Sequence, residues 1–435
     1  MNSINNTYKK PIKIGILFSI FTIILYEFGP YDFPRINREL LYFFLILCHL
    51  AMYLGYNSGT RYKTLIKNLR YINRKQILST LFWIALLVSL PRFMIHTGYT
   101  TNVIDRTLFS IYQFFNGGAA ELYASRQELT NVVGIWRYIN YMVVLLGPLH
   151  WSYNILGIYY WKDLSTFKKI STIIIWAIYL LEYICTGTNV GIFEFFITFF
   201  VVNIIRKIRY NIKFNKSSST NRYASIIIVA LVVILIFIFD YIMGARIGDN
   251  IDYLIIGQNT AFLDHDNILW QNTPNSLKNV FAYLIRYLAI PYGALELSFN
   301  IPWSPTLGIG HSWFLLDNVD IFGSLWDSTY QMKLEHLYDY DHYSNWHTAY
   351  LWIANDVSFV GVPIVLFVIF RIFGKSWKSF ILSGSICDLL IFMLFIKMMI
   401  FISANNQIFQ SSDNMIAFWL LLICRNKLNT YNWEV

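Results

Sequence analysis

The residues of this chain best suited to chemistry are a few charged side chains at the edges of apolar stretches. Arg246 follows a long apolar run in Gly244-Ala-Arg246-Ile-Gly248, and Arg286 interrupts the apolar period of 277–298. A guanidinium stays charged and binds phosphate oxygens through two parallel hydrogen bonds. Both arginines are therefore predicted to hold a diphosphate group, with Arg92 as a third candidate. An interfacial arginine that reaches lipid headgroups is the alternative for Arg246.

His347 is the candidate for proton transfer. It lies in Asn345-Trp346-His347-Thr348, directly before an apolar stretch. Imidazole titrates near neutral pH, so His347 can accept the proton of an attacking hydroxyl as a general base. The alternative is a histidine that caps the start of a helix.

Aromatic and acidic residues near these positions are secondary candidates. Tyr287, Tyr292 and Trp346 are predicted to contact the bound group or its sugars, because aromatic rings stack on sugar rings. Glu335 and Asp341 are the next candidates for the base. Glu335, His336, Asp339, Asp341 and His342 match no standard metal spacing, so a solvated acidic loop is expected, with no metal and no cofactor.

The composition indicates that these residues belong to a membrane protein. The chain has 435 residues, of which 56% are apolar and 14% charged, which is too apolar for a soluble domain. Several stretches reach the length needed to cross about 30 Å of hydrocarbon. Ten spans are predicted, near 11–28, 40–56, 77–95, 136–160, 170–186, 188–205, 224–244, 349–370, 380–403 and 414–424.

The distribution of lysine and arginine predicts the orientation. Segments 57–76 and 206–222 each carry six bases and no acid, which is typical of cytoplasmic loops. Both termini fall on the same side. The polar segment, 245–348, has four bases against eleven acids and is predicted to lie outside. The net charge of +9 therefore reflects the membrane topology. It favours contact with anionic lipids and does not imply binding to nucleic acid.

The same pattern predicts the parts of the chain. Residues 1–244 form a first bundle with a smaller outer loop at 96–135, the polar segment follows, and 349–435 supply the last spans. Within the polar segment, 277–290 is predicted to be a helix at the membrane surface or re-entering it, broken at Pro291. Asp356 falls inside the eighth span, so a helix break near Ser358 and Gly361, or a polar cavity, is expected.

The overall plan resembles the O-antigen polymerases of the Wzy type. Tyr283 to Leu297, YLIRYLAIPYGALEL, is similar to the arginine- and tyrosine-bearing outer helix of that family. Residues 345–361, NWHTAYLWIANDVSFVG, are similar to its loop-to-helix junction and to the His-[Asn/Ser/Gln]-x9-Gly-x-x-Gly pattern of the related O-antigen ligases. Thr348 and Ser358 depart from that pattern. Thr186-Gly-Thr-Asn189 stands where related polymerases often carry Gly-Ser-Arg.

The resemblance implies an all-α polytopic protein of the bacterial inner membrane, GT-C-like, with its active site facing the periplasm. It implies a glycosyltransferase that moves a growing glycan from undecaprenyl diphosphate to a sugar hydroxyl of the next lipid-linked repeat unit, without a metal. The implied partners are these lipid-linked oligosaccharides, membrane lipids and a chain-length regulator protein. An O-antigen ligase and a polysaccharide flippase are the alternatives.

Overall fold

The computed structural model describes residues 2–62, 70–71, 73–127, 134–214, 222–248, 250–319, 324–428 and 431–432. It is mostly helical (76%), as an all-α membrane protein requires. The base-rich segments 57–76 and 206–222 and the loop 96–135 lie partly outside the described residues.

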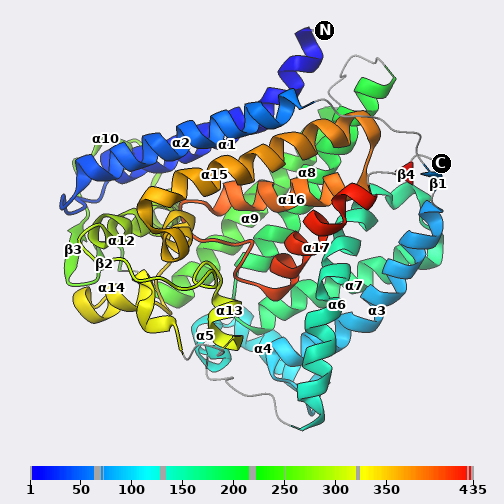
Figure 1. Cartoon of the computed structure of the whole chain (residues 1–435). Helices are drawn as coiled ribbons and strands as arrows, with labels where there is room; N and C mark the ends of the chain where they lie inside the picture. The colour runs from blue at the N-terminus through cyan, green and yellow to red at the C-terminus, as the bar shows by residue number, and fades with distance from the viewer. Residues whose placement is uncertain are drawn as a thin grey trace. The chain divides into compact units, whose positions relative to one another are not determined.

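The helices follow one another along the chain with few interruptions (Figure 1). The helices are α1 (Asn2–Phe28), α2 (Arg38–Arg61), α3 (Arg74–Thr97), α4 (Val103–Phe115), α5 (Ala119–Gln127), α6 (Ile135–Tyr159), η1 (Trp161–Asp163), α7 (Thr166–Cys185), α8 (Val190–Lys213), α9 (Arg222–Ile247), α10 (Ile268–Gln271), η2 (Asn275–Leu277), α11 (Lys278–Leu288), α12 (Ile290–Ser298), α13 (Trp313–Asn318), η3 (Trp326–Ser328), α14 (Tyr330–Tyr338), α15 (Ala349–Ser383), α16 (Ile386–Phe401) and α17 (Ser412–Leu428). The strands are β1 (Arg70–Tyr71), β2 (Tyr253–Ile256), β3 (Asn259–Phe262) and β4 (Tyr431–Asn432), in a parallel pair β1–β4 and an antiparallel hairpin β2–β3.

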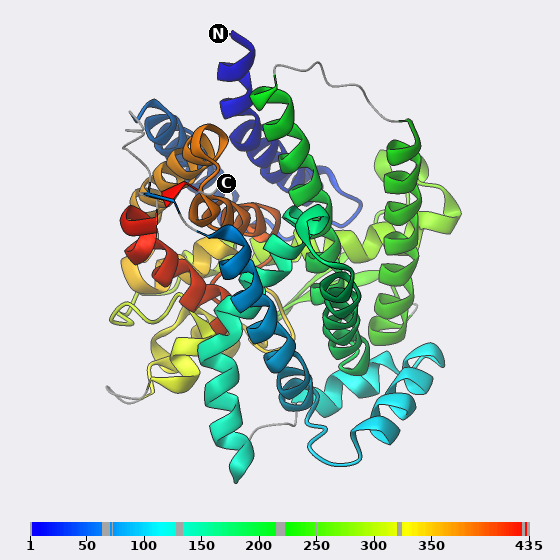
Figure 2. The ribbon, with the colours of Figure 1, turned by 90° about the vertical axis from the view of Figure 1, so that its right-hand side faces the viewer.

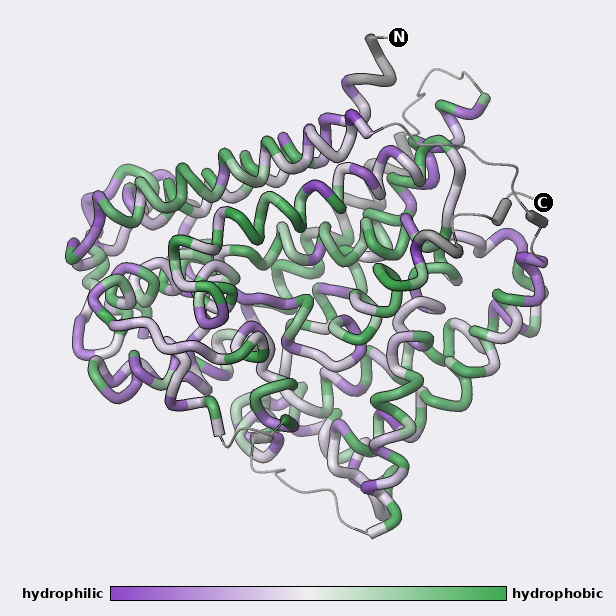
Figure 3. Tube along the Cα trace, in the orientation of Figure 1, coloured by the Kyte–Doolittle hydropathy of each residue, from purple (hydrophilic) through white to green (hydrophobic). Residues whose placement is uncertain are grey.

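Each of the ten predicted apolar stretches falls largely on a helix. Within the described residues, five helical segments are long and apolar enough to cross a membrane. They are Asn6–Phe28, Arg38–Arg61, Arg74–Thr97, Asn275–Ser298 and Ala349–Ser383. The long helices are coloured mostly as hydrophobic in Figure 3. The membrane character predicted from composition is thus supported, and the count of ten spans stays a prediction.

The chain forms two compact units. Unit 1 comprises Met1–Tyr71 and Asn250–Glu434, and unit 2 comprises Ile72–Asp249 with Val435. Unit 1 therefore combines α1 and α2 with the polar segment and everything after it. The predicted parts 1–244, 245–348 and 349–435 followed the order of apolar and polar stretches, and such an order does not reveal which helices pack together.

The main helix contact in unit 1 is between α2 and α15, which lie side by side in Figures 1 and 2. Gly55 and Gly59 of α2, spaced four residues apart on one face, let the two backbones approach closely. A Cβ atom on Gly55 would lie 2.2 Å from the carbonyl oxygen of Phe367, and one on Gly59 would lie 2.1 Å from that of Arg371. Only glycine fits at these two positions.

Helix α15 is bent at Ser358, which has φ 57° and ψ 172°. A non-glycine residue in this conformation costs on the order of 1–3 kcal/mol. The break predicted near Ser358 and Gly361 is therefore present, and it is Ser358 that carries it. Ser358 occupies the position of the first glycine in the ligase-like pattern, and its backbone has a conformation that glycine adopts most easily.

The helix predicted over 277–290 differs in detail. It ends at Leu288, the break falls at Ala289, and Pro291 lies in the first turn of α12, where its missing N–H costs little. The stretch Asn275–Ser298 is long enough to span a membrane, and 72% of its most apolar window of 18 residues is buried within the protein. An apolar period is compatible with a surface helix and with a buried one, so the period alone could not distinguish them.

In unit 2, α3 packs against α6 and α7, and α5 packs against α9. A buried cluster joins residues from α4, α5, α8 and α9, including Phe114, Leu122, Ile192 and Ile242. Figure 2 shows α3 and α6 side by side.

Candidate functional site

The start of α15 is capped by Thr348, not by His347. The Thr348 side chain accepts a hydrogen bond from the backbone N–H of Leu351 at 3.2 Å. A threonine at this position satisfies one of the free N–H groups of the first turn. The capping alternative for His347 therefore has no support in the geometry.

His347 is deeply buried, with only 2% of its surface exposed. Burial lowers the pKa of His347 from 6.5 to about 3, and the neighbouring charge of His342 acts in the same direction. Its Nε2 atom has no hydrogen-bond partner. The imidazole is thus neutral at physiological pH, which differs from the near-neutral titration expected from an imidazole at a loop-to-helix junction.

Three of the other predicted residues gather next to His347. The ring of Tyr340 lies edge-on to His347 at 5.1 Å between centroids, and its hydroxyl donates to the carbonyl of Trp346 at 2.9 Å. The rings of Trp346 and Tyr287 lie 5.7 Å apart. Burial raises the pKa of Tyr340 and the positive charge of Arg286 opposes this, so Arg286 is close by. The structure therefore brings Arg286, Tyr287, Trp346 and His347 together around a buried tyrosine that the sequence did not single out.

Tyr292 lies elsewhere, in the packing between α12 and α1. It is fully buried, its hydroxyl lies 2.9 Å from the Thr22 hydroxyl, and its ring contacts Tyr26 at 5.6 Å. Tyr26 in turn donates to Glu296 at 2.7 Å, and Glu296 accepts from Arg38 at 3.0 Å. These contacts give Tyr292 a packing role beside a buried ion pair.

Glu335, Asp341 and His342 form a small cluster, with possible ligand atoms within 4.8 Å of one another, a separation that a metal ion could bridge. Several of their polar atoms already form hydrogen bonds. Glu335 accepts from the backbone N–H and the ring of His342, and Asp341 accepts from the N–H of Tyr343 at 2.8 Å. Burial opposes ionisation of Glu335, but the bonds from His342 hold the pKa of its carboxyl below the ordinary value. The carboxylate is therefore ionised and engaged.

The other two predicted arginines belong to unit 2. Arg246 ends α9 and lies over the ring of Tyr123, 3.8 Å from its centroid, in a cation–π contact. Arg92 is buried and pairs with Glu182 of α7 at 3.1 Å, and His96 binds the same carboxylate at 2.6 Å. The charge of Arg92 is thus matched within its own unit. The predicted convergence of Arg246 and Arg286 stays a prediction, since they lie in different units.

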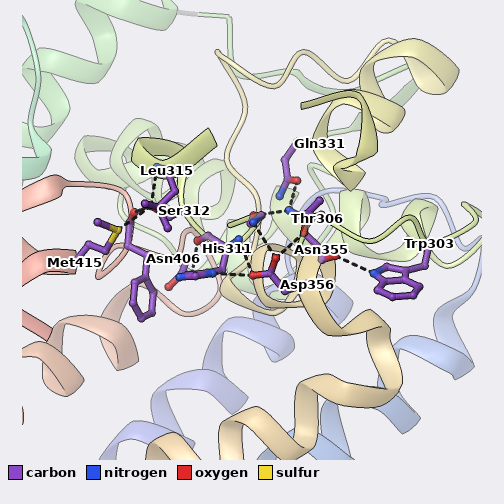
Figure 4. A network of polar contacts seen from close by, with 12 residues as sticks. Trp303, Thr306, His311, Ser312, Leu315, Gln331, Asn355, Asp356, Asn406 and Met415 are labelled. Atoms are coloured by element: carbon purple, nitrogen blue, oxygen red, sulfur yellow. Dashed lines mark hydrogen bonds and ion pairs between the residues drawn. The ribbon is translucent and has the colours of Figure 1, made fainter. Parts of the chain in front are cut away.

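Asp356, on the turn of α15 before the break, is held by a loop of the polar segment (Figure 4). Its Oδ1 accepts from the Thr306 hydroxyl at 2.6 Å and the Gly310 N–H at 2.8 Å. Its Oδ2 accepts from the N–H of His311 at 3.1 Å and from His311 Nδ1 at 2.7 Å. Four donors satisfy this carboxylate, which removes the cost of placing it in an apolar helix.

The preceding residue, Asn355, also forms hydrogen bonds with the polar segment around this loop. Its carbonyl accepts from the Trp303 indole at 2.8 Å, and its amide donates to the carbonyl of Gly310 and to Gln331, each at 2.8 Å. Its side-chain oxygen accepts the N–H of Tyr330 at 2.9 Å. Asn355 is fully buried, so the polar segment and α15 form one continuous hydrogen-bonded structure here.

His311 is the residue of this network that sequence reasoning missed. It follows the Gly308-Ile309-Gly310 turn, and nothing in its spacing marks it, because a loop histidine and a helix aspartate 45 positions later carry no shared period. The one available signal was Asp356, whose burial in an apolar stretch demanded a partner. No protein-family model, curated protein or solved structure matches this chain.

Proposed function

We propose that this protein is a membrane glycosyltransferase that polymerises lipid-linked oligosaccharides. In this proposal a glycan carried on undecaprenyl diphosphate is transferred to a sugar hydroxyl of the next lipid-linked repeat unit at the outer face of the bacterial inner membrane. The resemblance to O-antigen polymerases suggests the reaction, and the arrangement at the start of α15 supports it.

The observation that carries the proposal is the docking of the polar segment onto a broken membrane helix. Asn355 and Asp356 of α15 receive the loop around Gly310, and His347 and Trp346 stand at the start of the same helix. A lipid-linked sugar places its prenyl chain in the bilayer and its glycan in water, with the diphosphate between them. A polar, aromatic site at the start of a membrane helix suits such a substrate.

The chemistry needs a cation and a base. The leaving group is a diphosphate, already stable as an anion, so positive charge assists its departure. Arg286 is the cation of the junction in this proposal, and Arg246 and Arg92 are the further candidates from unit 2. Two histidines, His347 and His311, stand at the same junction as candidate bases for the acceptor hydroxyl.

The test is the lipopolysaccharide pattern of a deletion strain of the source bacterium. Lipopolysaccharide carrying a single repeat unit, restored to full-length polymer by the plasmid-borne gene, is the expected result. Complete absence of O-antigen on the core of the deletion strain, reversed by the plasmid-borne gene, would contradict polymerisation and point to a ligase or a flippase. An unchanged pattern would contradict any role in this assembly.

A further inference from the structure

We propose that His311 is the general base that activates the acceptor hydroxyl, with Asp356 as the residue that positions it. This inference rests on the proposed function and assigns one step of it. The pair lies at the break of α15, where the polar segment meets the membrane helix, and it does not include His347.

The hydrogen bond to Asp356 settles which nitrogen of His311 can act. A carboxylate only accepts, so the 2.7 Å contact between Asp356 Oδ2 and His311 Nδ1 places the proton on Nδ1. The lone pair of a neutral ring is then on Nε2. The backbone N–H of His311 donates to the same oxygen at 3.1 Å, so carboxylate and ring are held as a unit. An aspartate that fixes tautomer and orientation of a histidine is the arrangement that proton-accepting histidines use.

Nε2 of His311 is the unused atom of this arrangement. It is buried and has no hydrogen-bond partner, although the side chain as a whole is 17% exposed. Buried polar atoms of folded proteins almost always have a partner. Nε2 can therefore accept a hydrogen bond from a donor that enters this position, and a sugar hydroxyl is such a donor.

The turn between α16 and α17 supplies another unused polar atom beside His311. Asn406 donates from its amide to the carbonyl of His311 at 3.0 Å, while its own Oδ1 has no partner. Further along the chain, Gln410 Nε2 and Asn414 Oδ1, the latter in the first turn of α17, also lack partners. The ring of Phe409 lies edge-on to the imidazole at 4.7 Å. Several unsatisfied donors and acceptors with one aromatic ring are the chemistry that recognises a hydroxyl-rich ligand.

His311 fits the task better than His347. Both have a free Nε2, but His347 is 2% exposed and burial lowers its pKa to about 3, which makes it a weak proton acceptor. A carboxylate partner stabilises the imidazolium that forms during proton transfer, and His311 has one at hydrogen-bond distance.

The step balances as follows in this proposal. His311 Nε2 takes the proton of the acceptor hydroxyl, and the oxygen forms a bond to the reducing-end carbon of the donor glycan. The bond from that carbon to the diphosphate oxygen breaks, and undecaprenyl diphosphate leaves with the electron pair. The imidazolium later releases its proton to water.

The test uses the full-length purified protein in lipid nanodiscs. Its substrate is the undecaprenyl-diphosphate-linked repeat unit extracted from the deletion strain. The variants are His311→Gln, His311→Ala and Asp356→Asn, and His265→Gln is the control, an exposed histidine in the same segment. We expect His311→Gln to lower kcat about 100- to 10,000-fold, with His265→Gln unchanged. Added imidazole should restore activity to His311→Ala, and Asp356→Asn should lower kcat with little change in KM.

The pH profile provides the measurement that folding defects do not imitate. The wild-type kcat should decrease as the pH is lowered, and a plot of log kcat against pH should have a slope of one there, as expected for protonation of one base. Asp356→Asn should shift the pH at which this decrease occurs. Three outcomes would each overturn this assignment. They are a kcat of His311→Gln within about threefold of wild type, a His311→Ala variant whose activity imidazole does not restore, and a wild-type kcat that does not decrease at low pH. In those cases the wild type still polymerises. A wild type that makes no polymer from this substrate would instead overturn the proposed function.

Discussion

At the scale of single residues, the junction shows how burial decides the chemistry available to a side chain. His347 and His311 are both histidines of the polar segment, but one is enclosed by rings and the other is held by a carboxylate. The same contrast applies to the arginines. Arg92 is paired with a buried glutamate, whereas Arg286 acts electrostatically on Tyr340 at the junction.

Arg286 is predicted to be required for polymer formation. Arg286→Ala should lower activity about 100-fold or more, because a charge that stabilises the departing diphosphate is lost. Arg286→Lys should rescue poorly, since an ammonium cannot form the two parallel bonds of a guanidinium. The readout is polymer length in the complemented deletion strain at equal protein level. Lys278→Ala, which removes a cation from the start of the same helix, is the matched control, and wild-type polymer from Arg286→Ala would exclude the role.

His347 is predicted to make the protein sensitive to acid. The pKa is about 3 when folded and 6.5 ordinarily, so the unfolded chain binds the proton more tightly. The stability contributed by neutral His347 is complete above about pH 6.5. It is lost as pH falls towards 3, by about 1.4 kcal/mol per unit. His347→Gln should therefore lose less thermal stability than wild type between pH 7.5 and 5. Equal losses in differential scanning fluorimetry would contradict the buried neutral imidazole.

At the scale of secondary-structure elements, the contact of α2 with α15 holds the scaffold of the site. Gly55 and Gly59 let the backbone of α2 touch that of α15, and α15 then presents Asn355 and Asp356 to the polar segment. The close approach of these helices is thus a condition for the position of the broken helix end.

Substitution at the two glycines is predicted to disturb this contact. Gly55→Val or Gly59→Val should destabilise the protein by about 1–3 kcal/mol or more, because a Cβ would overlap a backbone oxygen that cannot move aside alone. Thermal unfolding of the purified protein measures the effect. Leu54→Ala, which alters an exposed side chain of α2, is the control. Glycine variants as stable as that control would contradict the contact.

The elements also show what a sequence can and cannot predict. Apolar runs of about 20 residues gave the helices, because hydrophobicity and length suffice for that. Asp356 predicted a helix break or a polar cavity, since an unpaired carboxylate in an apolar helix is too costly, and α15 has the break at Ser358. The partner His311 could not be predicted, because the path of the loop around Gly310 depends on contacts far apart in the chain. The packing of α1 and α2 with the polar segment could not be predicted either, for the same reason.

At the scale of the whole molecule, membrane topology remains the most direct prediction. Lys162 lies between α6 and α7 on the predicted cytoplasmic side, and His336 lies on α14 in the predicted outer segment. Both are exposed, and Cys424 is the exposed native cysteine. In a Cys424→Ser background, His336→Cys should react with an impermeant maleimide in intact spheroplasts, and Lys162→Cys only after permeabilisation. The reverse pattern would contradict the orientation.

The contact between α2 and α15 also has a consequence for biosynthesis. Near it, Lys378 donates to the carbonyl of Tyr62, 316 positions earlier in the chain. The ribosome therefore synthesises α2 long before α15, so the glycine face of α2 has no packing partner while most of the chain is made. During that interval the polar segment also lacks α15, the helix to which its loop around Gly310 binds. A chain truncated before α15 would therefore leave the glycine face of α2 without the helix that it packs against.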